Sequence, residues 1–235
     1  MGRAFEFRKA RKMKRWGNMS RLFTRYGREI AMAVKAGGAN PDGNSRLRAI
    51  IQNARQANMP KDNVERAITK ASDKSSADFK EMVYEGYGPH GIAILVETAT
   101  DNTTRTVANL RAIFVRNGGT LGNSGSVDFM FDRKCRFKIP KISTDLEEFE
   151  FELIDVGGEE AFEDEDGIVI YGEFASFGTI QKFLEDKGYS ILNAEFERIP
   201  SDTKELTEEQ QEEVNKLIDK IEEDDDVQNV YTTMV

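Results

Sequence analysis

The sequence predicts an α+β protein in which an N-terminal three-helix domain is followed by two α/β domains, one of them ferredoxin-like and inserted into the other. Three observations lead to this prediction. Apolar residues recur at helical spacing through residues 1–71. Segments typical of strands and of helices then alternate to the end of the chain. Residues 132–200 have the order strand, helix, strand, strand, helix, strand, which is typical of ferredoxin-like domains.

Residues 1–71 form the predicted helical domain. The first long helix has an apolar face and ends at the glycine pair Gly37-Gly38. A second helix covers about residues 45–58. A third begins near Pro60, because proline is favoured in the first turn of a helix. The polar, Ser-rich residues 72–78 are a predicted linker.

The outer α/β domain is predicted from residues 79–131 together with residues 201–235. Its expected elements are strands at 82–87, 92–100, 127–131 and 227–234 and helices at 102–117 and 207–223. The Gly-rich stretch 118–126 is interpreted as a plain connector. Loops that cradle phosphate run directly into a helix, whereas a strand is expected after this one.

Residues 132–200 form the inserted ferredoxin-like domain. Its expected elements are strands at 136–139, 161–164, 167–172 and 191–199 and helices at 145–156 and 174–187. The prediction depends on the order of these six segments along the chain. The last helix and strand of the outer domain follow it.

Charge is distributed unevenly along the chain. The whole protein is acidic, with a formal net charge of -9. Residues 1–70 nevertheless hold 17 Lys and Arg against 5 Asp and Glu, whereas residues 71–235 hold 16 against 37. A basic head on an acidic body is typical of a nucleic-acid-binding module joined to a second part.

The cations of the basic head are the candidate nucleic-acid contacts, because phosphate contact is the main sequence-independent source of nucleic-acid affinity. A close-set group precedes the first long helix, and a basic stripe follows one side of that helix, away from its apolar face. The predicted contacts are Arg8, Lys9, Arg11, Lys12, Lys14, Arg15, Arg21, Arg25, Arg28, Lys35, Arg46, Arg48 and Lys61. The alternative is a solvated basic arm, and the residues do not distinguish DNA from RNA.

No catalytic or metal site is predicted. His90 is the only histidine and Cys135 the only cysteine, so the usual catalytic sets and Cys-based metal sites lack their residues. The Asp and Glu clusters indicate solvated helix faces, and no segment has the apolar length of a membrane helix. We therefore expect a cytoplasmic, monomeric, non-enzymatic protein without a cofactor and without membrane association.

Two long stretches of the chain resemble a known family. FTRYGREIAMAVKAGGANPDGNSRLRAIIQNARQANMPKDNVERAI is similar to the first domain of the YebC/PmpR family, and YEGYGPHGIAILVETATDNTTRTVANLRAIFVRNGGTLGNSGSVDFMF is similar to its second. The NMPKDN, YEGYGP, TDNxxRT and GGxLGxxGSV segments are specific in combination, whereas the acidic final third matches loosely. The opening GRAFEFRKARKMKRW keeps the charge of the family's usual opening, close to GHSKWxxIKHRK, but not its residue order.

The resemblance implies three domains, no established catalytic site and a role in gene expression. Members of the family are described as probable transcriptional regulators that bind DNA. Bacterial members are also described as ribosome-associated factors that relieve stalling, notably at proline runs, and a mitochondrial relative activates translation of cytochrome c oxidase subunit one. We expect a DNA-binding transcriptional regulator. The alternative is a translation factor that binds ribosomal RNA on the ribosome, and a nuclease is a third, less favoured class.

Overall fold

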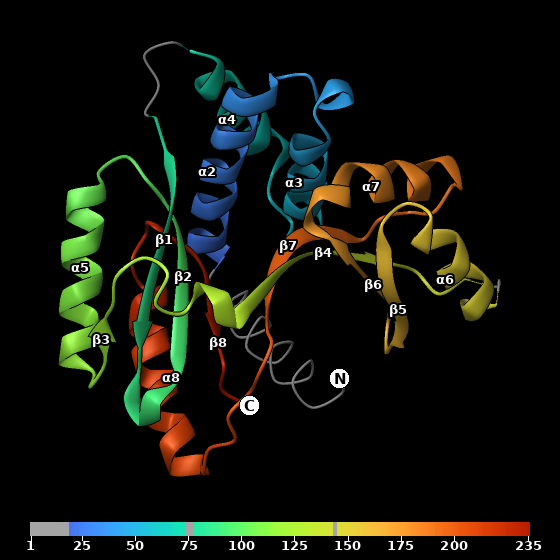
Figure 1. Cartoon of the computed structure of the whole chain (residues 1–235). Helices are drawn as coiled ribbons and strands as arrows, with labels where there is room; N and C mark the ends of the chain where they lie inside the picture. The colour runs from blue at the N-terminus through green and yellow to red at the C-terminus, as the bar shows by residue number, and fades with distance from the viewer. Residues whose placement is uncertain (1–18, 74–77, 143–144) are drawn as a thin grey trace. The chain divides into compact units, whose positions relative to one another are not determined.

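The computed structural model describes residues 19–73, 78–142 and 145–235 (Figure 1). By their contacts these residues form two compact units, each assembled from stretches that are distant in sequence. The first unit contains the described residues up to Met32, those from 78 to Asp132, and Ile199–Val235, and the second contains those from Ala33 to 73 and Arg133–Arg198. These units are defined only by contacts between residues. They do not test the domain boundaries predicted above, which stay a prediction.

The strands of the first unit form a four-stranded antiparallel sheet. They are β1 (Lys80–Tyr87), β2 (Ala93–Thr100), β3 (Thr120–Leu121) and β8 (Val227–Thr232). Their order is β3-β1-β2-β8. β1 and β2 pair along their whole length, from Lys80 opposite Thr100 to Tyr87 opposite Ala93. The last strand of the chain lies at the free side of β2 and completes the sheet.

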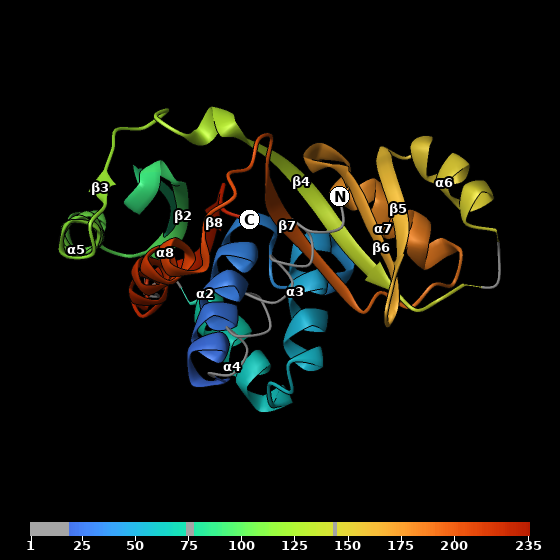
Figure 2. The same ribbon diagram turned by 90° about the horizontal axis from the view of Figure 1, so that it is seen from below.

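Two helices cover one face of this sheet (Figures 1 and 2). α5 (Thr103–Arg116) begins after Asn102, whose side chain accepts a hydrogen bond from the backbone N–H of Arg105. α8 (Glu208–Glu222) begins with a capping box built on Thr207. Both helices contribute their apolar stripes to one hydrophobic layer against the sheet. Its buried residues are Ile92, Ile94, Val96, Leu110, Phe114, Val214, Leu217, Ile218, Ile221, Val227, Val230 and Met234.

The predicted strand at 127–131 is wrong. Asp128–Met130 is a short 3-10 helix, and the next strand starts at Phe131. The cause is the buried carboxylate of Glu85 on β1. It accepts hydrogen bonds of 2.6–2.7 Å from three backbone N–H groups, those of Gly125, Val127 and Asp128. These N–H groups are therefore not available for hydrogen bonds to a neighbouring strand. Residues 125–130 accordingly form a loop with a 3-10 turn in place of a strand.

The second unit contains a ferredoxin-like sheet. Its strands are β4 (Phe131–Ile139), β5 (Gly158–Asp164), β6 (Gly167–Glu173) and β7 (Asn193–Pro200), and its helices are α6 (Leu146–Ile154) and α7 (Phe177–Asp186). The strand order is β5-β6-β4-β7. The first and third strands of the βαββαβ order therefore lie in the centre, as in ferredoxin-like domains. The predicted α+β class and this part of the fold are confirmed.

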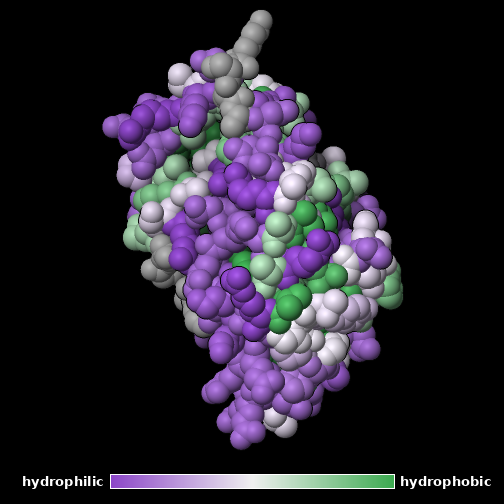
Figure 3. All heavy atoms as spheres, turned by 90° about the vertical axis from the view of Figure 1, so that its left-hand side faces the viewer, coloured by the Kyte–Doolittle hydropathy of each residue, from purple (hydrophilic) through white to green (hydrophobic). Residues whose placement is uncertain are grey.

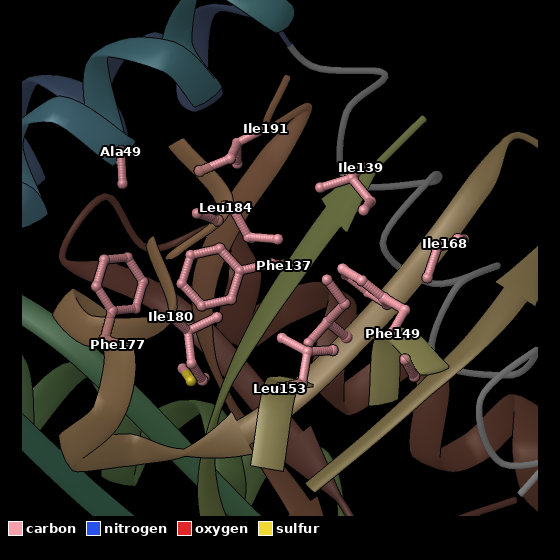
Figure 4. Close-up of a cluster of buried hydrophobic side chains, with 14 residues drawn as sticks. Ala49, Phe137, Ile139, Phe149, Leu153, Ile168, Phe177, Ile180, Leu184 and Ile191 are labelled. Carbon is pink, nitrogen blue, oxygen red and sulfur yellow. The ribbon is translucent and has the colours of Figure 1, made fainter. Parts of the chain in front are cut away.

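The core of the second unit lies between its sheet and its two helices (Figure 4). Phe149 and Leu153 of α6 and Ile180 and Leu184 of α7 belong to one buried cluster with Phe137 of β4. Both helices therefore pack on the same face of the sheet. Burying each side chain of this kind contributes about 1.5–3 kcal/mol, which fixes the positions of the two helices.

The N-terminal helices are α2 (Met19–Gly37), α3 (Ser45–Gln56) and α4 (Lys61–Ser72). α3 packs within the second unit through Ala49, which belongs to the same cluster as Phe137 (Figure 4). The side chain of Asn53 donates to the backbone carbonyl of Ala194 at 2.6 Å and accepts from its N–H at 3.0 Å. α3 is thus held by both apolar and polar contacts. Among the described helices, none is long and apolar enough to cross a membrane.

Candidate nucleic-acid interface

The predicted basic front is not covered by the structure. Arg8, Lys9, Arg11, Lys12, Lys14 and Arg15 all lie outside the described residues. The structure therefore places seven of the thirteen predicted contacts. They are Arg21, Arg25, Arg28, Lys35, Arg46, Arg48 and Lys61.

The basic stripe on α2 is not a continuous solvent-facing surface. Arg25 is only 8% exposed, and its guanidinium donates to the backbone carbonyl of Glu222. Arg28 donates to the carbonyl of Ala99 at 2.8 Å and to the Asp226 carboxylate at 2.7 Å. Helical periodicity places these arginines away from the apolar face, but other segments of the first unit cover them.

Asp226 is the centre of this polar cluster. Its side chain is 3% exposed and accepts hydrogen bonds from Arg28, Arg105, Thr100 and Thr106 at 2.7–3.1 Å. Burial alone would raise the pKa of Asp226, but the hydrogen bonds, that of Arg105 first, outweigh burial and hold this pKa below the usual value of an aspartate. Asp226 is therefore a charged structural anchor that holds Arg28 in the first unit.

Arg48 of α3 is also bound to the chain itself. Its guanidinium makes a two-point ion pair with Glu185 of α7, at 2.8 and 3.2 Å, and donates to the carbonyl of Pro41 at 2.8 Å. Both partners belong to the second unit. Arg46, on the same helix, is half-buried and also interacts with the chain.

The remaining predicted contacts are exposed. Arg21 and Lys35 lie at the two ends of α2, and Lys61 begins α4 with 78% of its side chain exposed. Lys61 forms a loose pair with Glu65 one turn further along, at 3.4 Å. Exposed pairs of this kind contribute only about 0.3–0.5 kcal/mol, so Lys61 can exchange this partner for a phosphate.

Two further exposed cations on these helices were missed by the sequence reasoning. Arg55 lies in the last turn of α3 and Lys70 in the last turn of α4. Within the described part of the chain, neither side chain has an ion pair or a hydrogen bond. The sequence analysis followed the stripe of the first helix, and only the packing of α3 and α4 separates exposed cations from bound ones.

The described residues contain no arrangement that suggests catalysis. No group of three or more His, Cys, Asp or Glu among them could hold a metal ion. Burial raises the pKa of the Cys135 thiol to about 12, so it is not a reactive thiolate at neutral pH. His90 lies in a turn and contacts the carboxylate of Glu213 at 2.8 Å. The polar groups that do cluster, around Asp226, satisfy one another.

Comparison with known families covers nearly the whole chain. Residues 3–74 match the family described as "TACO1/YebC protein N-terminal domain". Residues 79–234 match the family described as "TACO1/YebC second and third domain". The resemblance read from the sequence motifs and the family comparison therefore agree.

Relatives of similar length carry names that describe regulators. A protein from Flavobacterium johnsoniae is 66% identical over 100% of this chain and 99% of its own length, and is named a probable transcriptional regulatory protein. One from Parabacteroides distasonis, with the same name, is 62% identical over 100% of this chain and 97% of its own length. The crystal structure of a conserved hypothetical protein from Aquifex aeolicus is similar, with a TM-score of 0.78 and 38% identity over 92% of this chain and 90% of that one.

Proposed function

The chain belongs to the TACO1/YebC family, and from this premise we propose that it is a non-enzymatic, DNA-binding regulator of transcription. The names of its relatives support a regulator at the level of the family. The observation that carries DNA binding is the excess of 17 Lys and Arg over 5 Asp and Glu in residues 1–70. A segment so charged binds a polyanion through the release of its counterions.

In this proposal the phosphate contacts come from two places, the basic front of residues 8–15 and the exposed cations of the three N-terminal helices. The front supplies six cations, from Arg8 to Arg15. The helices add Arg55 and Lys70, together with Arg21, Lys35 and Lys61, which are exposed and also interact within the chain. Arg25, Arg28 and Arg48 instead hold the fold, because each is bonded to carbonyls or carboxylates of the chain. A phosphate would have to replace those partners before it could be bound.

The acidic body has a separate role in the proposal. Residues 71–235 contain 37 Asp and Glu against 16 Lys and Arg. Such a surface repels a polyanion, and only exposed charges within about 10 Å act strongly at 0.1 M salt. The body therefore restricts binding to the basic elements and keeps the protein from coating DNA at random.

The test is the salt dependence of DNA binding. Substituting Arg8, Lys9, Arg11 and Lys12 by Gln removes four proposed phosphate contacts. At about 0.9 per contact, the slope of log K against log salt should become shallower by up to about 3.6 for duplex DNA. Fluorescence anisotropy of a labelled 30-bp duplex, titrated at several salt concentrations, measures this slope.

The matched control removes the same charge from the body. Lys80, Lys141, Lys182 and Lys216 are exposed, and none of them has an ion pair in the described part of the chain. Substituting these four by Gln should leave the slope unchanged. An equal loss in both variants would show that net charge alone governs binding and would contradict a localised interface.

The ribosome is the competing target, and a sucrose gradient of native lysate separates the two. A regulator of transcription should stay near the top of the gradient after DNase treatment. Co-migration with ribosomes that survives DNase and is lost after RNase would instead support the translation factor. That outcome would overturn the proposed role in transcription while leaving nucleic-acid binding intact.

A further inference from the structure

The acidic body contains one long stretch without any acidic residue. Residues 102–127 include Arg105, Arg111 and Arg116 and no Asp or Glu. No other stretch of residues 71–235 without Asp or Glu is as long. The three arginines all lie on α5, so a local positive charge is built into the part of the chain that is otherwise most negative.

The outer face of α5 is the side that points away from the hydrophobic layer, and it is flanked by Arg111 and Arg116. At 3.6 residues per turn, Ala108 and Val115 project on the side opposite the buried Leu110, and Arg111 and Arg116 flank them. All four of these outer side chains are exposed. Figure 3 views the side of the molecule on which α5 lies in Figure 1 and shows a mostly hydrophilic surface with hydrophobic atoms near its centre and smaller patches of them toward its edges.

Arg111 and Arg116 have no partner within the described residues. Neither makes an ion pair, a hydrogen bond or a ring contact there. Other arginines of the first unit behave differently: Arg28 and Arg105 are both paired with Asp226, at 2.7 and 2.8 Å. The unit thus pairs the arginines near its acidic groups and leaves these two unpaired.

α5 holds the backbone positions of Arg111 and Arg116 at a defined spacing. The helix is fixed by Leu110 and Phe114, which are fully buried, and its first turn is capped by Asn102. Arg111 and Arg116 are five residues apart, which is about 7.5 Å along the axis. Five residues also turn the helix by about 140°, so the two side chains lie on either side of the outer face of α5.

Acidic groups lie beside α5 at its start and on α8, which packs against it. At the start, Asp101 contacts Arg105 and the Asp224 carboxylate accepts from Asn109 at 3.0 Å. Next to its end the chain continues as the Gly-rich residues 118–126, which carry no acidic side chain. Among the arginines of α5, a polyanion could contact Arg111 and Arg116 without first displacing a carboxylate of the described residues.

We propose that the outer face of α5, with Arg111 and Arg116 as its cations, is a second phosphate-binding surface for the phosphodiester backbone of nucleic acid. The inference rests on the proposed function in taking nucleic acid as the ligand. It goes beyond that function by placing contacts on the acidic body. The exposed Ala108 and Val115 between the two cations carry no charge that would oppose a phosphate.

The test is a double variant, Arg111→Gln with Arg116→Gln, in the full chain. Its matched control is Lys80→Gln with Lys216→Gln, two exposed and unpaired cations of the same unit. With the labelled 30-bp DNA duplex, the double variant should bind about tenfold or more weakly at 0.1 M salt, and its salt slope should be shallower by about 1.8. The control should match the wild type. Because all four side chains are exposed, thermal unfolding should be unchanged in both variants.

Each outcome separates this inference from the proposed function. If the front variant loses salt dependence while the α5 variant binds like the wild type, the α5 surface is overturned and the proposed function stands. If the wild-type protein binds neither the DNA duplex nor an RNA duplex of the same sequence, both fail. If the α5 double variant loses affinity only for the RNA duplex, the α5 surface is kept as a binding surface for RNA. That outcome would contradict the proposed DNA target.

Discussion

At the scale of single residues, the decisive property of a basic side chain in this protein is its partner. Arg28 and Arg111 are both helical arginines, yet the first is bonded to a buried carboxylate and the second to nothing among the described residues. An arginine that already has a carboxylate partner must lose it before binding phosphate. Bonded arginines therefore contribute to stability, and unpaired ones remain available for a ligand.

Asp226→Asn should destabilise the protein by about 3 kcal/mol, because it leaves the buried end of Arg28 without its counter-charge. Urea denaturation at pH 7 measures the free energy of unfolding. The control is Asp225→Asn at the exposed neighbouring position, which should have little effect. Equal stabilities of the two variants would contradict the role of Asp226 as an anchor.

The same position gives a prediction about pH. Because the pKa of Asp226 is lower in the folded protein than the usual value of about 3.9, its stabilising contribution is fully present above that value. It is lost as the pH falls toward the folded-state pKa. The difference in unfolding free energy between wild type and Asp226→Asn should therefore be constant from pH 7 to pH 5 and shrink below about pH 4.

At the scale of elements, one buried carboxylate decides the conformation of a loop. Periodicity predicts a strand at 127–131, since the segment is apolar and follows turn residues. Instead, the carboxylate of Glu85, some forty positions earlier, accepts hydrogen bonds from three backbone N–H groups of the loop. The loop in turn places Val127 and Phe131 on Ala93 and Leu95, on the face of the sheet opposite its helices.

Glu85→Gln should release this loop. A glutamine side chain presents an N–H group where the carboxylate accepted, and the loss should be about 2 kcal/mol of unfolding free energy. Amide hydrogen exchange of Gly125, Val127 and Asp128 should become faster, while exchange in α5 changes little. Glu212→Gln, at an exposed position on α8, is the control and should leave these amides protected. Unchanged exchange in Glu85→Gln would mean that the surrounding apolar contacts alone fix the loop.

At the scale of the whole molecule, two separate hydrophobic clusters support the two units. Phe137 belongs to the cluster of the second unit and Leu110 to that of the first, and both are fully buried. No buried residue is shared between these clusters. Each unit therefore has its own source of stability, although α2 and the strands at the unit boundaries run through both.

Truncating one core should loosen mainly its own unit. Phe137→Ala should cost about 3–5 kcal/mol and Leu110→Ala about 2–5 kcal/mol. In hydrogen exchange, the first variant should lose protection in β4 and β6 and the second in β2 and β8. Simultaneous loss in all four strands for either variant would show that the two units unfold as one cooperative body.

The fold class, most of the elements and the distribution of charge could be predicted from the amino-acid sequence, whereas the short strand β3 and the loop at 127–130 could not. Helical and strand periods are set by neighbouring residues, so α3, α5 and the ferredoxin-like order could be predicted. The motifs fixed the family for the same reason, since they are local.

Which cations are paired within the chain depends on its tertiary packing and could not be predicted from the sequence. Arg28 pairs with Asp226, which lies 198 positions further along the chain. Arg48 pairs with Glu185, at a separation of 137 positions. No local pattern predicts such pairs, because they depend on how distant segments pack. The same packing left Arg111 and Arg116 unpaired and exposed among the described residues. Charge can therefore be counted from the sequence, but its availability for a ligand is decided by the fold.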